Sequence, residues 1–371
     1  MKGNSHSIFT TLLTIYSYIL LEAKRHHRSA IGIIFEMIHL YIKKGIGPNY
    51  YILAGMADKK MPWEKKCQHL NNANYYNALD ILNPKAYRKL TQHKLDEKAF
   101  LTLAKIPTAD FIGFYHPVKG FDSKGSELTN INELSELLSG YQDKKVCIKI
   151  PEGFGGEGFF AGKIQEILND DIRIQSINKK EIKSLLVLLD DYVDVITSEG
   201  LLFEAYIEQS EEYAQFNLSS VNTVRTWVLQ QSGSIKVIGA LFRIGRINSS
   251  TDNSSAGGIV CPIDINTGKL AKGLTTLTPY RDDLLRHPDN GIQIYGEKLS
   301  RWSDVVHCSC ETLRKLPNTR FAGLDVCMTP QGPLIIEVNV EPDKDGAAHA
   351  GIPSYLLTQA ASELKVTKNR I

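Results

Sequence analysis

Near its C-terminus the chain reads Arg320-Phe321-Ala322-Gly323-Leu324-Asp325-Val326, followed after a Pro-Gln-Gly turn by Pro333-Leu334-Ile335-Ile336-Glu337-Val338-Asn339. Side chains of a strand alternate between its faces, so Glu337 and Asn339 point the same way, and across the turn Asp325 can share that face. The residues between them are apolar enough for both faces of this hairpin to be covered. Two carboxylates and an amide oxygen in such surroundings predict ligands of a hard cation such as Mg²⁺. A polar, solvated hairpin face is the alternative.

The bulk composition is that of a globular protein. The chain has 371 residues, of which 43% are hydrophobic and 23% charged, so it is long enough for two or three subdomains. Its net charge is only +2, but residues 1–100 carry 15 Lys and Arg against 7 Asp and Glu, and the remainder carries 28 against 34. This asymmetry indicates either a basic face toward an anionic partner, such as nucleic acid, a membrane or an acidic substrate, or a solvated helix face.

The cysteines and the N-terminal apolar stretch bear on location. Six cysteines without a C-x-x-C pair are typical of reduced, buried thiols in a cytosolic protein. Residues 8–21 are apolar but too short and too often interrupted for a transmembrane helix, and Lys24-Arg25-His26-His27-Arg28 follows. We expect a packed helix here, with an amphipathic helix on an anionic membrane surface as the alternative.

The order of secondary structure predicts the α+β class. Helices lead, antiparallel-looking strands dominate the second half, and there is no regular βαβ alternation. Helical patterns cover 8–42, 62–80, 87–104, 130–139, 179–190 and 298–316. Besides the C-terminal hairpin, strand patterns cover 144–151, 158–165, 170–176, 201–207, 222–230, 235–245 and 258–264.

A glycine-rich turn between two strands is the second strong signal. Gly153-x-Gly155-x-x-Gly158 matches a dinucleotide fingerprint, but that motif must open a helix, and Phe159 to Ile164 has the pattern of a strand. The segment therefore predicts a hairpin whose bare amides, Gly156 included, fold over nucleotide phosphates. Lys149, the charge inside the strand that leads to this turn, is placed to reach an α- or β-phosphate. A structural hairpin with an outward-reaching lysine is the alternative.

Further polar residues lie on apolar strands. Leu201 to Gln209 could hold adenine by its backbone, with a carboxylate accepting from the exocyclic amine. Arg225, Arg243 and Arg246 occur in β-prone segments, where each could clamp a phosphoryl or carboxylate group or pair with a structural acid.

Taken in order, these parts resemble the ATP-grasp superfamily over roughly residues 40–355. The spaced motifs Asn222-Thr223-x-Arg225, Arg243-x-Gly245, Asp252-Asn253 with Gly257-Gly258, and Asp264-x-x-Thr267-Gly268 look most like its sugar-transfer-associated branch. The resemblance implies an α+β ATP-grasp fold that holds the nucleotide between two antiparallel-sheet subdomains. Its expected parts are a mainly helical region 1–93, a lid subdomain 94–205 and a large subdomain 206–371.

The resemblance also implies site residues. The expected ATP contacts are Lys94, Lys149, Gly153, Gly155, Gly156, Gly158, Glu204, Ala205, Ile207, and Glu208 or Glu211. Two Mg²⁺ ions are expected on Asp325, Glu337 and Asn339, and the acceptor near Asn222, Arg246, Asp252, Asn253, Gly257 and Gly258. Many ATP-grasp ligases carry an arginine two residues before the first metal aspartate, where this chain has Gly323. We hypothesise that Arg225 or Arg243 supplies the missing catalytic guanidinium.

The activity that the resemblance implies is ATP-dependent ligation, in which a carboxylate forms an acyl phosphate and an amine then forms an amide. The branch points to surface or capsular polysaccharide synthesis, with an amino acid joined to a uronic acid or an amino sugar. We expect no nucleic-acid partner and a cytoplasmic protein, with association with the inner membrane face or a glycosyltransferase as an alternative.

Two other functions remain as alternatives, a sugar-hydroxyl kinase and a non-catalytic ATP-binding partner of a glycosyltransferase. No G-x-S-x-G elbow or zinc spacing occurs, and no histidine lies in the nucleotide motifs, which argues against a hydrolase or a zinc enzyme.

Overall fold

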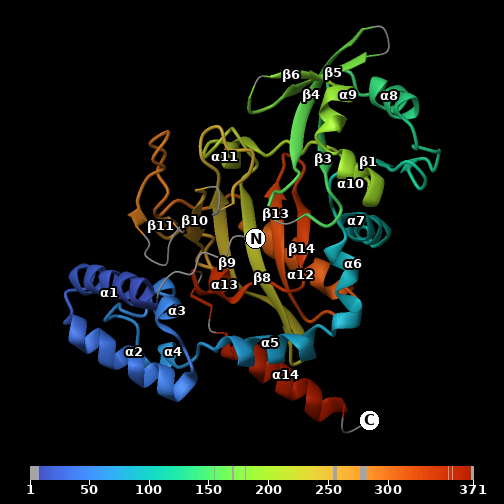
Figure 1. Ribbon diagram of the computed structural model, residues 1–371. Coiled ribbons are helices and arrows are strands. Elements are labelled where there is room, and N and C mark those ends of the chain that lie inside the picture. The colour runs from blue at the N-terminus through green and yellow to red at the C-terminus, as the bar shows by residue number, and fades with distance from the viewer. Residues whose placement is uncertain are drawn as a thin grey trace.

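The computed structural model describes residues 8–153, 155–168, 171–179, 181–253, 257–275, 282–349, 351–352 and 354–368. Figure 1 shows two sheets, one above the other, with the N-terminal helices at one side of the lower sheet. All pairings between neighbouring strands within the sheets are antiparallel. The expected α+β architecture of two antiparallel sheets is therefore confirmed.

The upper sheet, called the lid sheet, has the strand order β2-β1-β7-β3-β4-β5-β6. Helices α8 (Ile131–Ser139), α9 (Leu185–Asp190) and α10 (Val193–Ser198) cover one face and enclose an apolar cluster. The strands are β1 (Phe111–Tyr115), β2 (Phe121–Asp122), β3 (Lys145–Lys149), β4 (Phe160–Leu168), β5 (Asp171–Ser176), β6 (Ile182–Ser184) and β7 (Leu201–Ala205).

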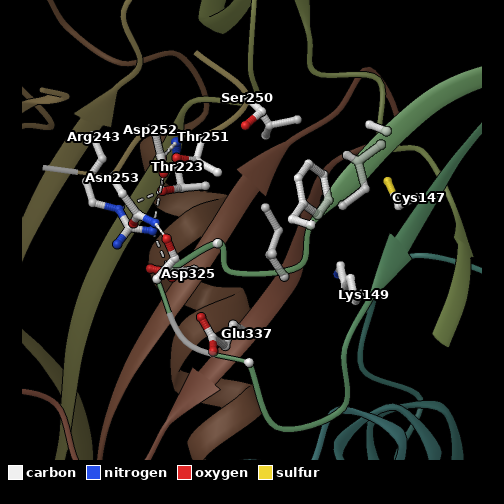
Figure 2. A pocket seen from close by; sticks show the side chains of 18 of the residues that line it. Cys147, Lys149, Thr223, Arg243, Ser250, Thr251, Asp252, Asn253, Asp325 and Glu337 are labelled. Carbon is white, nitrogen blue, oxygen red and sulfur yellow. Dashed lines mark hydrogen bonds and ion pairs between the residues drawn. The ribbon is translucent and has the colours of Figure 1, made fainter. Parts of the chain in front are cut away.

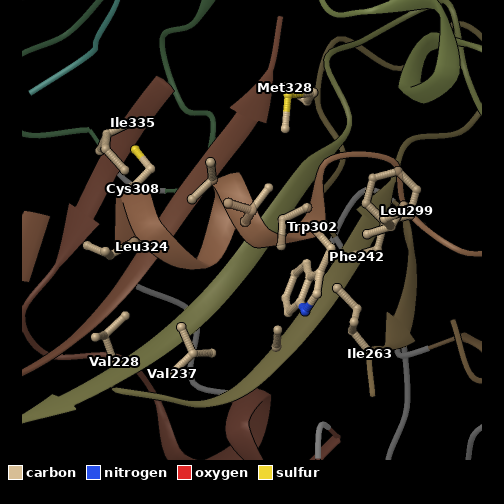
Figure 3. Close-up of a cluster of buried hydrophobic side chains, with 14 of the residues drawn as sticks. Val228, Val237, Phe242, Ile263, Leu299, Trp302, Cys308, Leu324, Met328 and Ile335 are labelled. Atoms are coloured by element: carbon tan, nitrogen blue, oxygen red, sulfur yellow. The ribbon is translucent and has the colours of Figure 1, made fainter. Parts of the chain in front are cut away.

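The lower sheet, called the large sheet, has the order β12-β11-β10-β9-β8-β13-β14. Helix α12 (Trp302–Lys315) covers one face, where its Trp302 and Cys308 pack with Val228 and Phe242 of the sheet (Figure 3). The strands are β8 (Thr223–Gln231), β9 (Ser234–Ile244), β10 (Ile259–Pro262), β11 (Gly273–Thr275), β12 (Asp283–Leu284), β13 (Phe321–Met328) and β14 (Pro333–Asn339).

The opposite face of the large sheet is covered over only part of its area. Helices α5 (Asn72–Leu82) and α14 (Tyr355–Lys368) pack there on Trp227 and Leu229 of β8. Arg225, two residues before Trp227, is on the same face of β8, beyond the core that these helices cover. This open end of the face is the floor of the cleft between the sheets.

The N-terminal region forms its own apolar cluster, in which α1 (Ile8–Arg25) and α2 (Ala30–Lys44) pack on α3 (Pro48–Leu53). Ser29 caps α2 by accepting from the Gly32 amide, and α2 ends at Gly45, whose φ of 68° suits glycine. Short helices α4 (Trp63–Lys66), η1 (Lys85–Tyr87), α6 (Lys89–Gln92), α11 (Glu211–Ala214) and α13 (Lys344–His349) complete the connections, together with α7 (Lys94–Leu103). No helix in the described ranges is both long and apolar enough to cross a bilayer.

The helical patterns over 8–42 and 62–80 are each divided by a turn, at 26–29 and at 67–71, and two further helix predictions were wrong in detail. The single helix expected over 87–104 is broken at His93, because α7 begins anew at Lys94, whose amide donates to the Pro151 carbonyl of the glycine hairpin. The helix expected over 179–190 begins with strand β6, which pairs with β5, and only Leu185–Asp190 is helical. In both places a tertiary backbone bond outweighed the local pattern.

The two sheets take their strands from 111–205 and 223–339. We propose three regions, a helical region 1–93, a lid subdomain 94–205 and a large subdomain 206–371. Helix α5 belongs to the first region but packs on the large sheet. Residues 1–7 and 369–371, at the ends of the first and third regions, lie outside the described residues.

Candidate active site

Three polar residues form one row across the large sheet. Asp325 of β13 lies opposite Arg225 of β8 on one side and Glu337 of β14 on the other. Val326 pairs with Ile335, so without a bulge Asp325 would lie opposite Ile336. The bulge shifts the register by one residue and brings the two carboxylates onto one face, as the hairpin sequence predicts. Asn339, two residues after Glu337, shares this face.

The carboxylate of Asp325 is held by two guanidinium groups. Arg225 binds it through both Nε and Nη2, and the Nη2 atoms of Arg225 and Arg243 each lie 2.8 Å from Oδ2. Asp325 is only 2% exposed. Burial by itself would raise the pKa of Asp325, but the charges of Arg225 and Arg243 outweigh it and keep the pKa below its ordinary value. The carboxylate is therefore ionised and fixed.

The Arg225 side chain passes close to Gly323. A Cβ atom there would lie 3.0 Å from Cβ of Pro342 and 3.4 Å from Cδ of Arg225. The Arg225 side chain thus already covers position 323. This geometry favours Arg225 over Arg243 as the replacement for the guanidinium that many ATP-grasp ligases carry there.

The expected metal ligands fit a hard cation by their chemistry. Asp325, Glu337 and Asn339 offer two carboxylates and an amide oxygen, the donors that Mg²⁺ prefers. In the described part of the chain the side chain of Glu337 makes no hydrogen bond or ion pair, so its carboxylate oxygens remain available. Within the same ranges, no group of three His, Cys, Asp or Glu side chains is placed to hold a metal.

A second buried carboxylate lies in the lid sheet. Glu204 of β7 forms ion pairs with two lysines. Its Oε2 lies 2.5 Å from Nζ of Lys149, and its Oε1 lies 2.6 Å from Nζ of Lys98 of α7. Burial opposes ionisation of Glu204, but the charges of Lys149 and Lys98 outweigh it and lower its pKa. Although burial works against the charged lysine, Glu204 also raises the pKa of Lys149. The side chain of Glu204 therefore orients two lysines, whereas the sequence suggested a contact with the adenine amine.

The glycine hairpin is held at both of its sides. Lys94 donates from Nζ to the Gly153 carbonyl at 2.5 Å, and Asn253 of the loop after β9 donates to the Gly155 carbonyl. Gly156 has a φ of 86°, and a Cβ there would come within 2.7 Å of Thr251. Only glycine allows the lid to approach the large subdomain this closely.

One cavity of about 390 Å³ lies between the two halves. In Figure 2, Lys149 and Cys147 lie on one side, and Asp325, Glu337, Arg243 and Asp252 on the other. The predicted residues that line it are Lys94, Lys149, Gly153, Gly155, Gly156, Glu204, Ala205, Ile207, Arg225, Arg243, Asp252, Asn253, Asp325, Glu337 and Asn339.

The remaining predicted residues lie outside the lining of this cavity. Asn222 is fully buried and bonds to Tyr213 and Asn217, and Arg246 is tied to Asp289. Glu208 pairs with Lys145 at 2.7 Å beside a neighbouring cavity of about 1030 Å³. Glu211 begins α11, and Gly158, Gly257 and Gly258 shape turns. We therefore withdraw these seven residues as direct ligands.

Two residues without a predicted role, Lys98 and Thr223, bind side chains of the site. Lys98 lies four residues after Lys94 on one helix face, a spacing that could have marked it. Thr223 accepts from Arg243 Nε at 3.0 Å and donates its hydroxyl to Asp252, whose pKa is raised by burial in spite of the Arg243 charge. Thr223 thereby links the acceptor loop to the guanidinium pair.

Solved structures with a similar arrangement share little sequence with this chain. D-alanine-D-alanine ligase from Coxiella burnetii is 10% identical, with a TM-score of 0.40 over 76% of this chain and 60% of that one. An L-amino acid ligase from Bacillus licheniformis is 11% identical, with a TM-score of 0.39 over 73% and 48%. A carboxyaminoimidazole ribonucleotide synthase from Aspergillus clavatus is 8% identical, with a TM-score of 0.42 over 75% and 56%. The chain spans less than two thirds of each.

No curated protein matches the chain by sequence. The model of one family does match it: the sugar-transfer-associated ATP-grasp family covers residues 71–353, which include both sheets and the whole cavity. The chain belongs to the sugar-transfer-associated ATP-grasp family.

Proposed function

We propose that this protein is an ATP-dependent carboxylate–amine ligase that forms ADP and phosphate. The observation that carries the proposal is one cavity in which Lys149 and the glycine hairpin face the row of Arg225, Asp325 and Glu337. Phosphoryl transfer needs charge neutralisation and positioning more than a protein nucleophile, and this cavity supplies both.

On the lid side, the chain's own groups suit the nucleotide. Lys149 and Lys94 would bind phosphate oxygens, and the backbone of Ala205 and Ile207 would hold adenine. Glu204 keeps Lys149 charged and directed into the cavity.

On the opposite side, Asp325, Glu337 and Asn339 would hold Mg²⁺. Bound there, Mg²⁺ would neutralise charge on the phosphates. We propose two Mg²⁺ ions at this site.

The two arginines favour an anionic acceptor. Each guanidinium has five N–H donors, and Arg225 and Arg243 use only some of them on Asp325 and Thr223. Their remaining N–H groups can bind a substrate carboxylate and the charge that grows on the transferring phosphoryl group.

The chemistry then has two balanced steps. A carboxylate oxygen of the substrate attacks the γ-phosphorus, the bond to the β-phosphate oxygen breaks, and ADP leaves an acyl phosphate behind. The amine nitrogen attacks the acyl carbon, the carbon–oxygen bond breaks, and inorganic phosphate departs with the carboxylate's oxygen while the amine proton passes to solvent. The family supports a sugar substrate, so we propose an amino acid joined to a uronic acid or an amino sugar of a surface polysaccharide.

The test is a screen for ADP release. Purified protein with Mg²⁺ and ATP is given pairs of uronic acids and amino acids, and hydroxylamine replaces the amine in a parallel set. We expect ADP release with at least one pair and a hydroxamate in the hydroxylamine set. The Lys149→Met variant should lose both signals, whereas Lys145→Met, on the same strand but outside the cavity, should keep them.

Two outcomes would overturn the proposal. A phosphate ester without hydroxamate would identify a kinase, because only an acyl phosphate reacts with hydroxylamine to give hydroxamate. Tight ATP binding with no ADP release from any pair would identify a non-catalytic nucleotide-binding partner.

A further inference from the structure

The N-terminal helices have a second apolar stripe that nothing in the described chain covers. Their inner stripes, including Ile19 of α1 and Ile33 and Leu40 of α2, pack into one cluster with α3. Their outer stripes are 41% to 79% exposed. On α1 the outer stripe consists of Leu12, Leu13, Tyr16, Leu20 and Leu21, and on α2 of Ile31, Phe35, Ile38, Tyr41 and Ile42.

Since both inner stripes face the same cluster, both outer stripes face away from the molecule. Figure 1 shows this hairpin at the edge of the protein, with α1 and α2 side by side and away from the lid sheet. A surface helix ordinarily turns one apolar stripe inward and a polar face outward. By contrast, α9 and α10 of the lid expose three large apolar side chains between them. Ten large apolar side chains exposed on two neighbouring helices indicate an interaction site.

The exposed basic side chains of the hairpin lie at its two ends. Lys24 and Arg25 lie at the end of α1, and Lys43 and Lys44 at the end of α2, whereas Arg28 of the turn points inward to Glu36. Residues 8–66 contain nine Lys and Arg against four Asp and Glu. The exposed apolar side chains of the hairpin therefore lie between two positively charged ends.

The hairpin's two acidic residues are turned inward. Glu22 is 2% exposed and pairs with His26 at 3.3 Å. Glu36 is bound by Arg28 at 2.9 Å and Lys66 at 2.5 Å. The hairpin therefore presents no acidic side chain of its own on its outer surface, and the acidic groups beside its turn, Asp58 and Asp282, lie against His26 and Arg25.

We propose that the outer face of the α1–α2 hairpin docks on a membrane that contains anionic lipids. The helices lie parallel to the bilayer, their outer stripes enter the boundary of the acyl chains, and the basic ends contact headgroup phosphates. Tyr16 and Tyr41 suit this depth, because an aromatic ring with a polar tip favours the interface. A second copy of the chain fits less well, since a two-fold contact along the hairpin would bring basic ends together.

Docking would also fix the position of the cleft. Tyr75 of α5 donates to the Pro342 carbonyl at 2.7 Å, and Nζ of Lys344 lies 3.2 Å from the centre of the Tyr50 ring. Pro342 and Lys344 directly follow the strand that carries Glu337 and Asn339. The membrane-facing region and the catalytic floor are therefore one packed unit, and this inference stands whether or not the proposed ligase activity is correct.

The test is flotation of the full-length protein with vesicles in a density gradient. We expect it to float with phosphatidylcholine vesicles that contain phosphatidylglycerol, and at least tenfold less with phosphatidylcholine alone. Raising salt from about 0.1 M to 0.5 M should lower the bound fraction severalfold, because screening weakens the basic contacts.

Variants distinguish binding through the outer face from nonspecific hydrophobic adsorption to vesicles. Combined Ile31→Ser, Phe35→Ser and Ile42→Ser should reduce flotation at least tenfold, and Lys24→Glu with Lys43→Glu severalfold. Leu186→Ser with Val187→Ser, equally exposed on the lid, should change nothing. All three variants should keep the thermal midpoint and the ATP affinity of the native protein.

Three results would overturn the inference. These are absence of flotation with anionic vesicles, equal flotation of the outer-face variant, and a dimer in light scattering that the outer-face substitutions dissociate while vesicles never bind. The last result would assign the face to a second copy of the chain.

Discussion

The cleft is bounded by two buried carboxylates in similar surroundings but with different partners. Glu204 in the lid sheet lies between Lys98 and Lys149, and Asp325 in the large sheet lies between Arg225 and Arg243. Each carboxylate is about 2% exposed, and each has a pKa lowered by two cations against the effect of burial.

The difference lies in the cations. A lysine is a point charge on a flexible stem, whereas an arginine holds both oxygens of a carboxylate in one plane. The Glu204 cluster can thus release Lys149 to a phosphate and take it back, while the Asp325 cluster is a rigid frame. Under the proposed function, the lid half would follow the nucleotide and the floor would stay still under the metal and the acceptor.

The largest effect is expected when the buried carboxylate of the large sheet, Asp325, is neutralised. Asp325→Asn keeps the shape but removes a metal ligand and the charge between two arginines, so ATP turnover should fall about 10³-fold. Turnover is measured by coupled ADP release, with Asp289→Asn, which pairs Arg246 outside the cavity, as the control. Turnover above a tenth of the native value would show that the floor is not the metal site.

Removing the lysine on the lid side should cost less. Lys149→Met should weaken ATP binding and turnover together by about 10²-fold, because one phosphate contact is lost while the others remain. Calorimetry gives the ATP affinity, and Lys145→Met should stay within about twofold of the native protein. Equal effects of the two variants would remove Lys149 from the phosphate site.

The frame itself is tested by Arg225→Lys. The positive charge is kept, but a lysine cannot bind Asp325 through two N–H groups, so turnover should fall about 10-fold to 100-fold. Arg246→Lys, which disturbs a bidentate pair away from the cavity, is the matched control. Full turnover of Arg225→Lys would mean that charge alone is needed there.

The carboxylate of the lid cluster is tested by Glu204→Gln. Lys98 and Lys149 then lose their negatively charged partner, and we expect KM for ATP to rise about fivefold to tenfold, about 1 to 1.4 kcal/mol, with kcat nearly unchanged. A fall in kcat of the same size with KM unchanged would instead place Glu204 in the chemical step.

The same variant should also change the stability of the protein in a way that depends on pH. The pKa of Glu204 is lowered in the folded state, so the stability it contributes is present above its unfolded pKa and is lost as pH falls through the folded one. Urea unfolding should show the native protein more stable than Glu204→Gln by about 3 kcal/mol at pH 7, with the gap closing below about pH 4. A gap that does not change with pH would rule out the ionised carboxylate as its source.

The sequence allowed prediction of the catalytic floor because strand alternation is a local rule. Asp325, Glu337 and Asn339 lie on one face as expected, although the bulge that aligns them leaves no mark in the residues themselves. The glycine hairpin was predicted for the same reason, since its glycines lie between two strands and three of them line the cavity.

The rest depended on contacts between distant segments. Asn222 and Arg246 stand in the same kind of β-prone segment as Arg225, and only the folded chain shows that their partners are structural. The break at His93 arises from a bond between Lys94 and Pro151, 57 positions along the chain. The apolar stretch of residues 8–21 predicted a packed helix, but one side packs and the other is exposed.

The central claim is that the two halves of the cleft together activate a carboxylate by phosphorylation. The direct measurement uses a carboxylate substrate labelled with ¹⁸O, ATP and the amine, followed by mass analysis of the released phosphate. An acyl phosphate requires one labelled oxygen in every phosphate formed with product, which is the predicted result. Unlabelled phosphate alongside product, or label that stays wholly in the product, would contradict the account.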